Sequence, residues 1–246
     1  MMKDILTIVW KEWKEFVRQR SSLRGTVMVM VVPALILGVL FPFQAGRMWM
    51  ESPLQFASWV WVPLFMVATM ISDSFAGERE RHTLETLLAS RLGDDTILFG
   101  KIIAAMCFAL ALTYFIVILG ILTVNVTQWD GEPILLSLKM FGAGIVFSIL
   151  VAWFAASAGV LVSLRAATVR QAQQTLSFAI IALAFLPGIA FQILPVSAKK
   201  GVASFFESAG TTRVIMIIIG VLIIINAVLL KAARLRFRRT CHTVII

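Results

Sequence analysis

Three features between positions 73 and 101 are of types that could do chemistry: the Gly100–Lys101 pair, His82 and Asp73. A phosphate-binding loop needs the pattern GxxxxGK(S/T), but isoleucine follows Lys101, so this pair is not expected to bind a nucleotide. His82 and His242 are the only histidines, and neither stands at a metal-ligand spacing from cysteine or carboxylate partners. Asp73 is the single acid inside an apolar run, whereas a hydrolase buried in a membrane needs a nucleophile with a base, or paired carboxylates. We therefore predict no catalytic residue and no resident metal, and interpret Asp73 as a helix-end or loop-capping group.

The charged segment 74–101, SFAGERERHTLETLLASRLGDDTILFGK, is longer than a simple connection between neighbouring helices requires. Residues 78–89 are good helix formers with acids in the first turns, where the helix dipole favours negative charge. Leu84, Leu87 and Leu88 would form a narrow apolar ridge on that helix. The ridge fits either a groove in a soluble partner or the surface of the protein's own membrane domain, and periodicity alone leaves both interpretations open.

Composition decides the environment of the whole chain. Of its 246 residues 60% are hydrophobic and only 14% charged, and the mean hydropathy is +0.94, which is too apolar for a water-soluble core. The net charge of +9 is spread between apolar runs rather than gathered on a soluble surface, so no nucleic-acid partner is expected. Cys107 and Cys241 form no paired framework, and the N-terminal residues do not resemble a cleavable signal peptide, so we expect free cysteines and a mature N-terminus.

The predicted fold class is an all-α membrane protein with six transmembrane helices, because a helical crossing takes about 20 residues. The predicted spans cover residues 26–46, 54–74, 99–125, 138–163, 174–196 and 213–231. With both termini in the cytoplasm, the Lys and Arg residues that fall outside are Arg47, Lys139, Lys199, Lys200 and Arg213, out of 22 in the chain. This asymmetry favours an even number of spans with both ends inside.

Residues 1–25 are predicted to contain an amphipathic interfacial helix. Leu6, Val9, Trp13 and Phe16 recur at steps of three and four, and the charged side chains fall mainly on the opposite side. Tryptophan at headgroup depth beside basic side chains is typical of such helices. The alternative is a cytoplasmic extension of the first span.

Two further stretches carry local signals. In the fourth span small residues recur every four positions from Gly144 to Ala156, which predicts close helix packing either within one subunit or between subunits. Residues 187–212 contain two prolines and an amphipathic piece, which suggests a broken helix with an external re-entrant segment.

The string GERERHTLETLLAS, followed by Gly100 and Lys101, resembles the signature of type-2 ABC transporter permeases, most closely the bacterial sodium- and drug-export type. His82 stands where that family usually has glycine, and Arg91 where proline is common. In the family this segment transmits movement from a cytoplasmic ATPase. The resemblance assigns ATPase coupling to Glu78, Glu80, Thr83, Leu84, Glu85, Leu87, Leu88, Gly100 and Lys101.

The resemblance also implies an organisation and a set of partners. Residues 1–246 would form one permease domain, with a coupling segment at 75–98 and a basic cytoplasmic tail at 232–246. The expected partners are a cytoplasmic ABC ATPase, a second permease copy or homologue, and membrane lipid. No cofactor is expected in the chain itself, since ATP and Mg²⁺ would bind the ATPase, and the expected location is the plasma (inner) membrane.

Several alternatives stay open at this stage. A self-sufficient secondary transporter or channel, or a membrane scaffold without transport, would share the hydropathy. The basic loop at 165–174 is either a second ATPase contact or a positive-inside anchor. The cargo is either a hydrophobic or amphiphilic compound or a small ion, and aromatic residues such as Trp59 either line its path or face lipid.

Overall fold

The computed structural model describes residues 2–19, 27–51, 55–83, 91–193, 195–197, 201 and 211–244. Over these ranges the chain is helical apart from turns and short connections, and it contains no strand. This agrees with the predicted all-α class, because apolar segments in lipid must satisfy their backbone groups internally. The larger elements are α1 (Met2–Gln19), α6 (Gln55–Ser72), α9 (Asp94–Thr127), α10 (Leu138–Ser163), α11 (Val169–Ile193) and α13 (Thr211–Val244).

Four described helical stretches are long and apolar enough to cross a membrane. They are Trp59–Glu80, Asp94–Thr127, Leu138–Ser163 and Met216–Phe237. α9 and α13 have 34 residues each, or about 51 Å at 1.5 Å per residue. That length exceeds a hydrocarbon layer of about 30 Å, so both helices extend beyond it.

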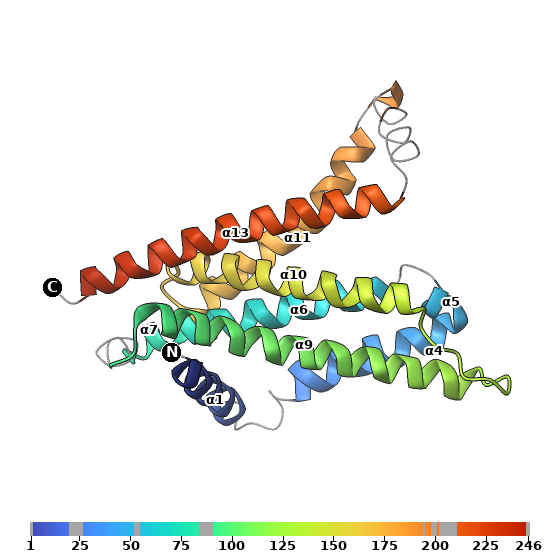
Figure 1. Cartoon of the computed structure of the whole chain (residues 1–246), viewed down its shortest axis with the longest axis horizontal. Helices are drawn as coiled ribbons and strands as arrows, with labels where there is room; N and C mark the ends of the chain where they lie inside the picture. Colours follow the sequence, from blue (N-terminus) through green and yellow to red (C-terminus); the bar gives the residue numbers. More distant parts are fainter. Residues whose placement is uncertain are drawn as a thin grey trace.

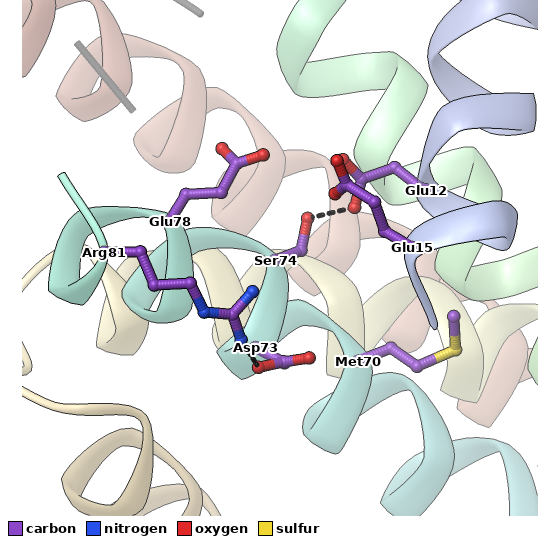
Figure 2. A pocket seen from close by; sticks show the side chains of 7 residues that line it. All are labelled: Glu12, Glu15, Met70, Asp73, Ser74, Glu78 and Arg81. Atoms are coloured by element: carbon purple, nitrogen blue, oxygen red, sulfur yellow. Dashed lines mark hydrogen bonds and ion pairs between the residues drawn. The ribbon is translucent and has the colours of Figure 1, made fainter. Parts of the chain in front are cut away.

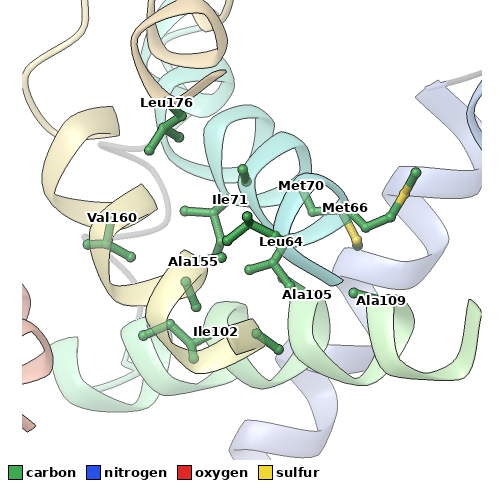
Figure 3. Packing of buried hydrophobic residues seen from close by; sticks show 14 of the residues in the cluster. Leu64, Met66, Met70, Ile71, Ile102, Ala105, Ala109, Ala155, Val160 and Leu176 are labelled. Carbon is green, nitrogen blue, oxygen red and sulfur yellow. The ribbon is translucent and has the colours of Figure 1, made fainter. Parts of the chain in front are cut away.

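The bundle is built around α6, which packs against α10 and α9 and also contacts α11 (Figure 1). α13 packs on the other side of α10. Ile71, Ala109 and Ala152 are fully buried where α6, α9 and α10 meet, and Figure 3 shows the surrounding cluster of aliphatic side chains.

The small residues of α10 face α6. A Cβ on Gly144 would lie 2.7 Å from the Trp59 ring, and one on Gly159 would lie 2.9 Å from Ile71. The stripe therefore serves packing within this chain, one of the two uses that the sequence left open. Trp59 is 1% exposed and makes edge-on contacts with Tyr114 and Phe141, so it is part of the core.

The first predicted span, 26–46, has a different character from the others. Residues 27–45 are helical but alternate between π-helical and α-helical turns: η1 (Val27–Val31), α3 (Val32–Leu35), η2 (Ile36–Leu40) and α4 (Phe41–Ala45). Pro33 and Pro42 lie within this stretch and remove backbone donors, which favours such irregular turns. Val32–Ala45 is an apolar helix, but it is shorter than a membrane crossing. Gly46, with φ of 57°, ends the stretch before α5 (Arg47–Glu51).

The other predicted spans differ from the structure mainly at their ends. α10 has the predicted bounds, whereas α6 continues through η3 (Asp73–Gly77) into α7 (Glu78–Glu80). α13 continues as one helix through the predicted basic tail at 232–246 as far as Val244. In the predicted re-entrant stretch, α11 extends to Ile193, and residues 194, 198–200 and 202–210 lie outside the described part.

Candidate functional site at the α1 end of the bundle

Lys101 lies in the second turn of α9, and its side chain is fully buried. Its ammonium nitrogen is 2.8 Å from Oε1 of Glu12 and 2.8 Å from Oε1 of Glu78. It also donates to the hydroxyl and the carbonyl oxygen of Ser74, at 2.9 and 3.1 Å. A buried ammonium is tolerated only when it is paired and hydrogen-bonded. Lys101 therefore joins three elements, α1, η3–α7 and α9, through one charged group.

The carboxylate of Glu12 is held by two further contacts. The Ser74 hydroxyl donates to Glu12 Oε2 at 2.6 Å (Figure 2), and Lys11 lies nearby on the same helix while it binds Glu78 at 2.9 Å. Burial alone would raise the pKa of Glu12, but the charge of Lys101 and the hydrogen bonds from Lys101 and Ser74 hold that pKa below its ordinary value. Burial likewise opposes the charged form of Lys11, yet the hydrogen bond and charge of Glu78 raise the Lys11 pKa. Both groups stay ionised at neutral pH.

Gly100 allows α1 to approach α9. A Cβ at this position would lie 2.7 Å from Cγ2 and 2.8 Å from Cβ of Ile8, which is 2% exposed. The indole N–H of Trp13 adds a hydrogen bond to the Ala104 carbonyl at 3.2 Å. The glycine and lysine of the Gly100–Lys101 pair thus have separate roles, close approach and charge pairing.

The orientation of α1 corrects the sequence-based description of its polar side. The predicted polar side includes Glu12, which is only 9% exposed because it faces α9 and η3. The apolar residues Leu6 and Trp10 are 63% and 69% exposed. The helix therefore has a protein-facing charged stripe and an outward apolar stripe, and it is inclined to the long helices in Figure 1.

The helix that contains Glu78 ends two residues later. The Thr83 N–H bonds the Glu78 carbonyl at 2.9 Å, and the His82 N–H bonds the Arg79 carbonyl at 3.1 Å. This is the Schellman pattern of a helix C-terminus, in which the residue after the C-cap is left-handed. His82 has φ of 57°, which explains why glycine suits this position. The predicted helix start at Glu78 is therefore wrong, since α7 continues the preceding helix and stops at Glu80.

The α10–α11 connection is attached to α7. Arg79 donates to the carbonyl oxygens of Leu164 and Ser163 at 3.1 and 3.3 Å, and the Glu80 carboxylate accepts the Val169 N–H at 3.1 Å. The loop beginning at 165 thus contacts the charged segment directly.

α13 closes the same end of the bundle. Arg234 binds Asp95 through two hydrogen bonds of 2.8 and 2.6 Å. The Phe237 ring packs edge-on against Phe75, whose own ring lies 5.4 Å from the Lys101 ammonium. The longer helices α1, α6 with its extension η3–α7, α9, α10, α11 and α13 therefore all contribute to this end.

The structure brings together three of the predicted coupling residues, Glu78, Gly100 and Lys101. Glu80 and Thr83 lie on the adjacent turn, and the Thr83 hydroxyl donates to the Glu78 carbonyl at 3.2 Å. The remaining predicted residues, Leu84, Glu85, Leu87 and Leu88, lie outside the described residues. Asp73, interpreted from the sequence as a helix-end or loop-capping group, lies inside the continuous stretch of α6, η3 and α7. It pairs with Arg81, just after that stretch ends, at 3.2 Å.

Sequence reasoning missed Glu12 and Ser74. Glu12 follows Ile8 by four residues, so the two lie on one face of α1. An acid four residues after an aliphatic residue was a usable signal that both face the protein. The stronger apolar periodicity of the neighbouring face, Leu6 to Phe16, hid this signal.

A metal ion is an alternative use of the same acids. Carboxylate oxygens of Glu12, Glu15 and Glu78 lie within 4.8 Å of one another, beside a cavity of about 20 Å³ (Figure 2). However, Lys101 and Lys11 contact these carboxylates already. The arrangement is therefore an ion-pair network, which we call the Lys101 network: Lys11, Glu12, Ser74, Glu78 and Lys101.

Over the described residues the chain is helical, has several stretches apolar and long enough to cross a membrane, and gathers its buried charges at one end of the bundle, which is the organisation of a multi-pass membrane protein. The family model of the ABC-2 type transporter matches residues 3–200, and the chain belongs to that family. No curated protein matches the chain. The family match confirms the resemblance drawn from the GERERHTLETLLAS string and the Gly100–Lys101 pair.

Proposed function

We propose that this chain is the membrane-spanning subunit of an ATP-driven exporter whose ATPase is a separate polypeptide. The observation that carries the proposal is the Lys101 network, which links the segment resembling the family's coupling element to α1 and α9 through buried ion pairs. The family match makes a permease role plain. ATP and Mg²⁺ would bind the partner, and the permease would contribute no cofactor or catalytic residue.

The route of movement follows from the contacts. A displacement of the segment after Thr83 would reach α6 directly, because α7, η3 and α6 are consecutive turns of one helical stretch. Lys101 would pass it to α9, and Glu12 would carry α1 along. Arg79 and Glu80 would pass it to the α10–α11 connection. Buried ion pairs suit this task, because separating them is costly and the linked elements then move together.

The proposed topology places the α1 end in the cytoplasm. α1 packs on the first turns of α9, and Arg234 near the C-terminus binds Asp95 in those same turns, so the described terminal helices share one end. The positive-inside bias favours the cytoplasmic side of the inner membrane for that end. In this arrangement the stretch 27–45 and α11 complete six crossings, and the exposed Leu6 and Trp10 lie in the headgroup layer.

A second permease copy or homologue is part of the proposal. The α13 span is only 11% buried, against 67% for Trp59–Glu80, so apolar surface is available for lipid or another subunit.

The described buried charged side chains are Glu12, Glu78 and Lys101, all at the α1 end. Ion-coupled carriers commonly hold ionisable groups near the membrane midplane, so this distribution favours an external energy source.

The test is to co-express the chain with an ABC ATPase encoded beside it and to measure capture and ATP turnover. The native permease should retain the ATPase, and Leu84→Asp combined with Glu85→Lys should release it while membrane insertion persists. Lys101→Met should retain the ATPase but change its turnover, because the substitution leaves the docking segment intact and removes the link that transmits its movement to α9. Lys139→Met, the same change at an exposed lysine, is the matched control. Failure of the native chain to capture any such ATPase would overturn the proposal.

A further inference from the structure

A basic cavity of about 520 Å³ lies at the end of α10, between α11 and α13. Both of these helices pack on α10. Its lining includes two arginines, Arg165 and Arg236, and an apolar floor formed by Leu161 and Val162. The volume falls in the range of small-molecule sites, about 300–1,000 Å³. No carboxylate is present among the described residues that line it.

The orientation of α13 determines which of its arginines lines the cavity. Arg234 points to α9, where it binds Asp95. Arg236 follows two residues later, about 200° around the helix, and so faces the cavity. Arg165 is exposed in the turn that ends α10. Guanidinium groups offer paired N–H donors that match phosphate oxygens.

A neutral donor stands beside the arginines. The Gln171 side chain lines the cavity, and its Oε1 accepts the Ala167 N–H at 2.8 Å. This hydrogen bond fixes the amide, whose nitrogen still carries two N–H donors. The cavity therefore offers charged and neutral donors above an apolar floor.

We propose that this cavity binds the phosphate headgroup of an anionic phospholipid. The inference rests on the proposed topology, which puts the α1 end at the cytoplasmic leaflet, where anionic lipids are attracted to basic sites. The cavity lies where α10 ends, which in that topology is headgroup depth. Phe178, three residues after the lining residue Thr175 on α11, is 73% exposed, and Leu235 beside Arg236 is 53% exposed. These side chains offer an apolar surface for acyl chains, which a soluble phosphate would not use.

The experiment measures lipid binding to the purified permease by native mass spectrometry in detergent, with added phosphatidylglycerol or phosphatidylcholine. The test variant is Arg165→Gln with Arg236→Gln. The control is Arg170→Gln with Lys231→Gln, which removes the same charge from exposed residues at the same end. Arg236 is partly buried, so a folding defect must be separated from a loss of lipid binding. Arg165→Gln, at an exposed residue, is therefore measured alone as well. The ATPase is not needed, so a failure here is distinct from a failure of ATPase capture.

The native permease should bind phosphatidylglycerol at least about tenfold more tightly than phosphatidylcholine. The double arginine variant should lose that preference, Arg165→Gln should lose part of it, and the control should keep it. Equal binding of the two lipids, or equal behaviour of the test and control variants, would overturn the proposal. A second arm compares the rise in melting temperature caused by phosphatidylglycerol and by inorganic phosphate. Equal rises would assign the cavity to soluble anions and overturn the lipid assignment.

Discussion

Replacing Lys101 with methionine is the most direct test of the Lys101 network. Methionine has nearly the same length and shape but no charge, so packing in α9 is largely kept. The substitution leaves two carboxylates without their shared cation. The side chains of Glu12 and Glu78 are only 10% and 7% exposed, so water cannot replace the ammonium.

The expected magnitude follows from the distances. Two unit charges 2.8 Å apart attract by about 6 kcal/mol at an effective dielectric constant of about 20. Desolvation offsets much of this attraction, and breaking a buried pair typically costs about 3–5 kcal/mol. Lys11 remains bound to Glu78 and is 37% exposed, so it compensates one of the two carboxylates. We therefore expect a loss of about 3 kcal/mol in the free energy of unfolding.

The assay is reversible unfolding in mixed micelles, followed by tryptophan fluorescence, with Lys139→Met as the matched control. Glu12→Gln is measured alone and together with Lys101→Met. The double variant should be less destabilised than the sum of the single variants, because Glu12 no longer needs the lysine. The reasoning is refuted if Lys101→Met stays within about 0.5 kcal/mol of the control, the range of surface changes, or if the two substitutions are additive.

Three further predictions concern the same end of the bundle. Gly100→Ala should destabilise the protein, because overpacking against Ile8 costs about 1–3 kcal/mol. The control Gly142→Ala, where a Cβ would meet nothing within 4 Å, should be neutral or stabilising in the same unfolding assay. Equal effects of the two substitutions would contradict the close approach of α1 to α9. His82→Gly should raise stability by about 1 kcal/mol, since it relieves a left-handed residue, whereas His82→Ala should show no gain in thermal unfolding. The Glu12 pKa is lowered from 4.5, so the stability that this ionised carboxylate contributes is present above pH 4.5 and lost as the pH falls through the lowered pKa. Melting curves should therefore show a steeper loss of stability in acid for the native protein than for Glu12→Gln. Identical pH profiles would argue against this role of Glu12.

The sequence by itself determined the environment and class of this protein. Apolar runs of about 20 residues have no stable alternative to helices in lipid, so the bounds of α10 could be read directly. The family match confirms what the GERERHTLETLLAS string and the Gly100–Lys101 pair indicated. These signals are local in the chain, and local patterns are what a single sequence exposes.

Only the tertiary structure decided what the Gly100–Lys101 pair contacts. Glu12 and Lys101 are 89 residues apart, and their pairing depends on how α1 is rotated on α9, which Ile8 and Gly100 set by shape. Periodicity assigned Glu12 to a polar side and could not distinguish water from a buried ammonium as its partner. The helix end at His82 was hidden for a related reason: helix propensity favoured continuing past Glu80, but the bonds from Thr83 and His82 end the helix there. Contacts between distant segments and left-handed backbone turns depend on three-dimensional packing, which sequence spacing does not encode.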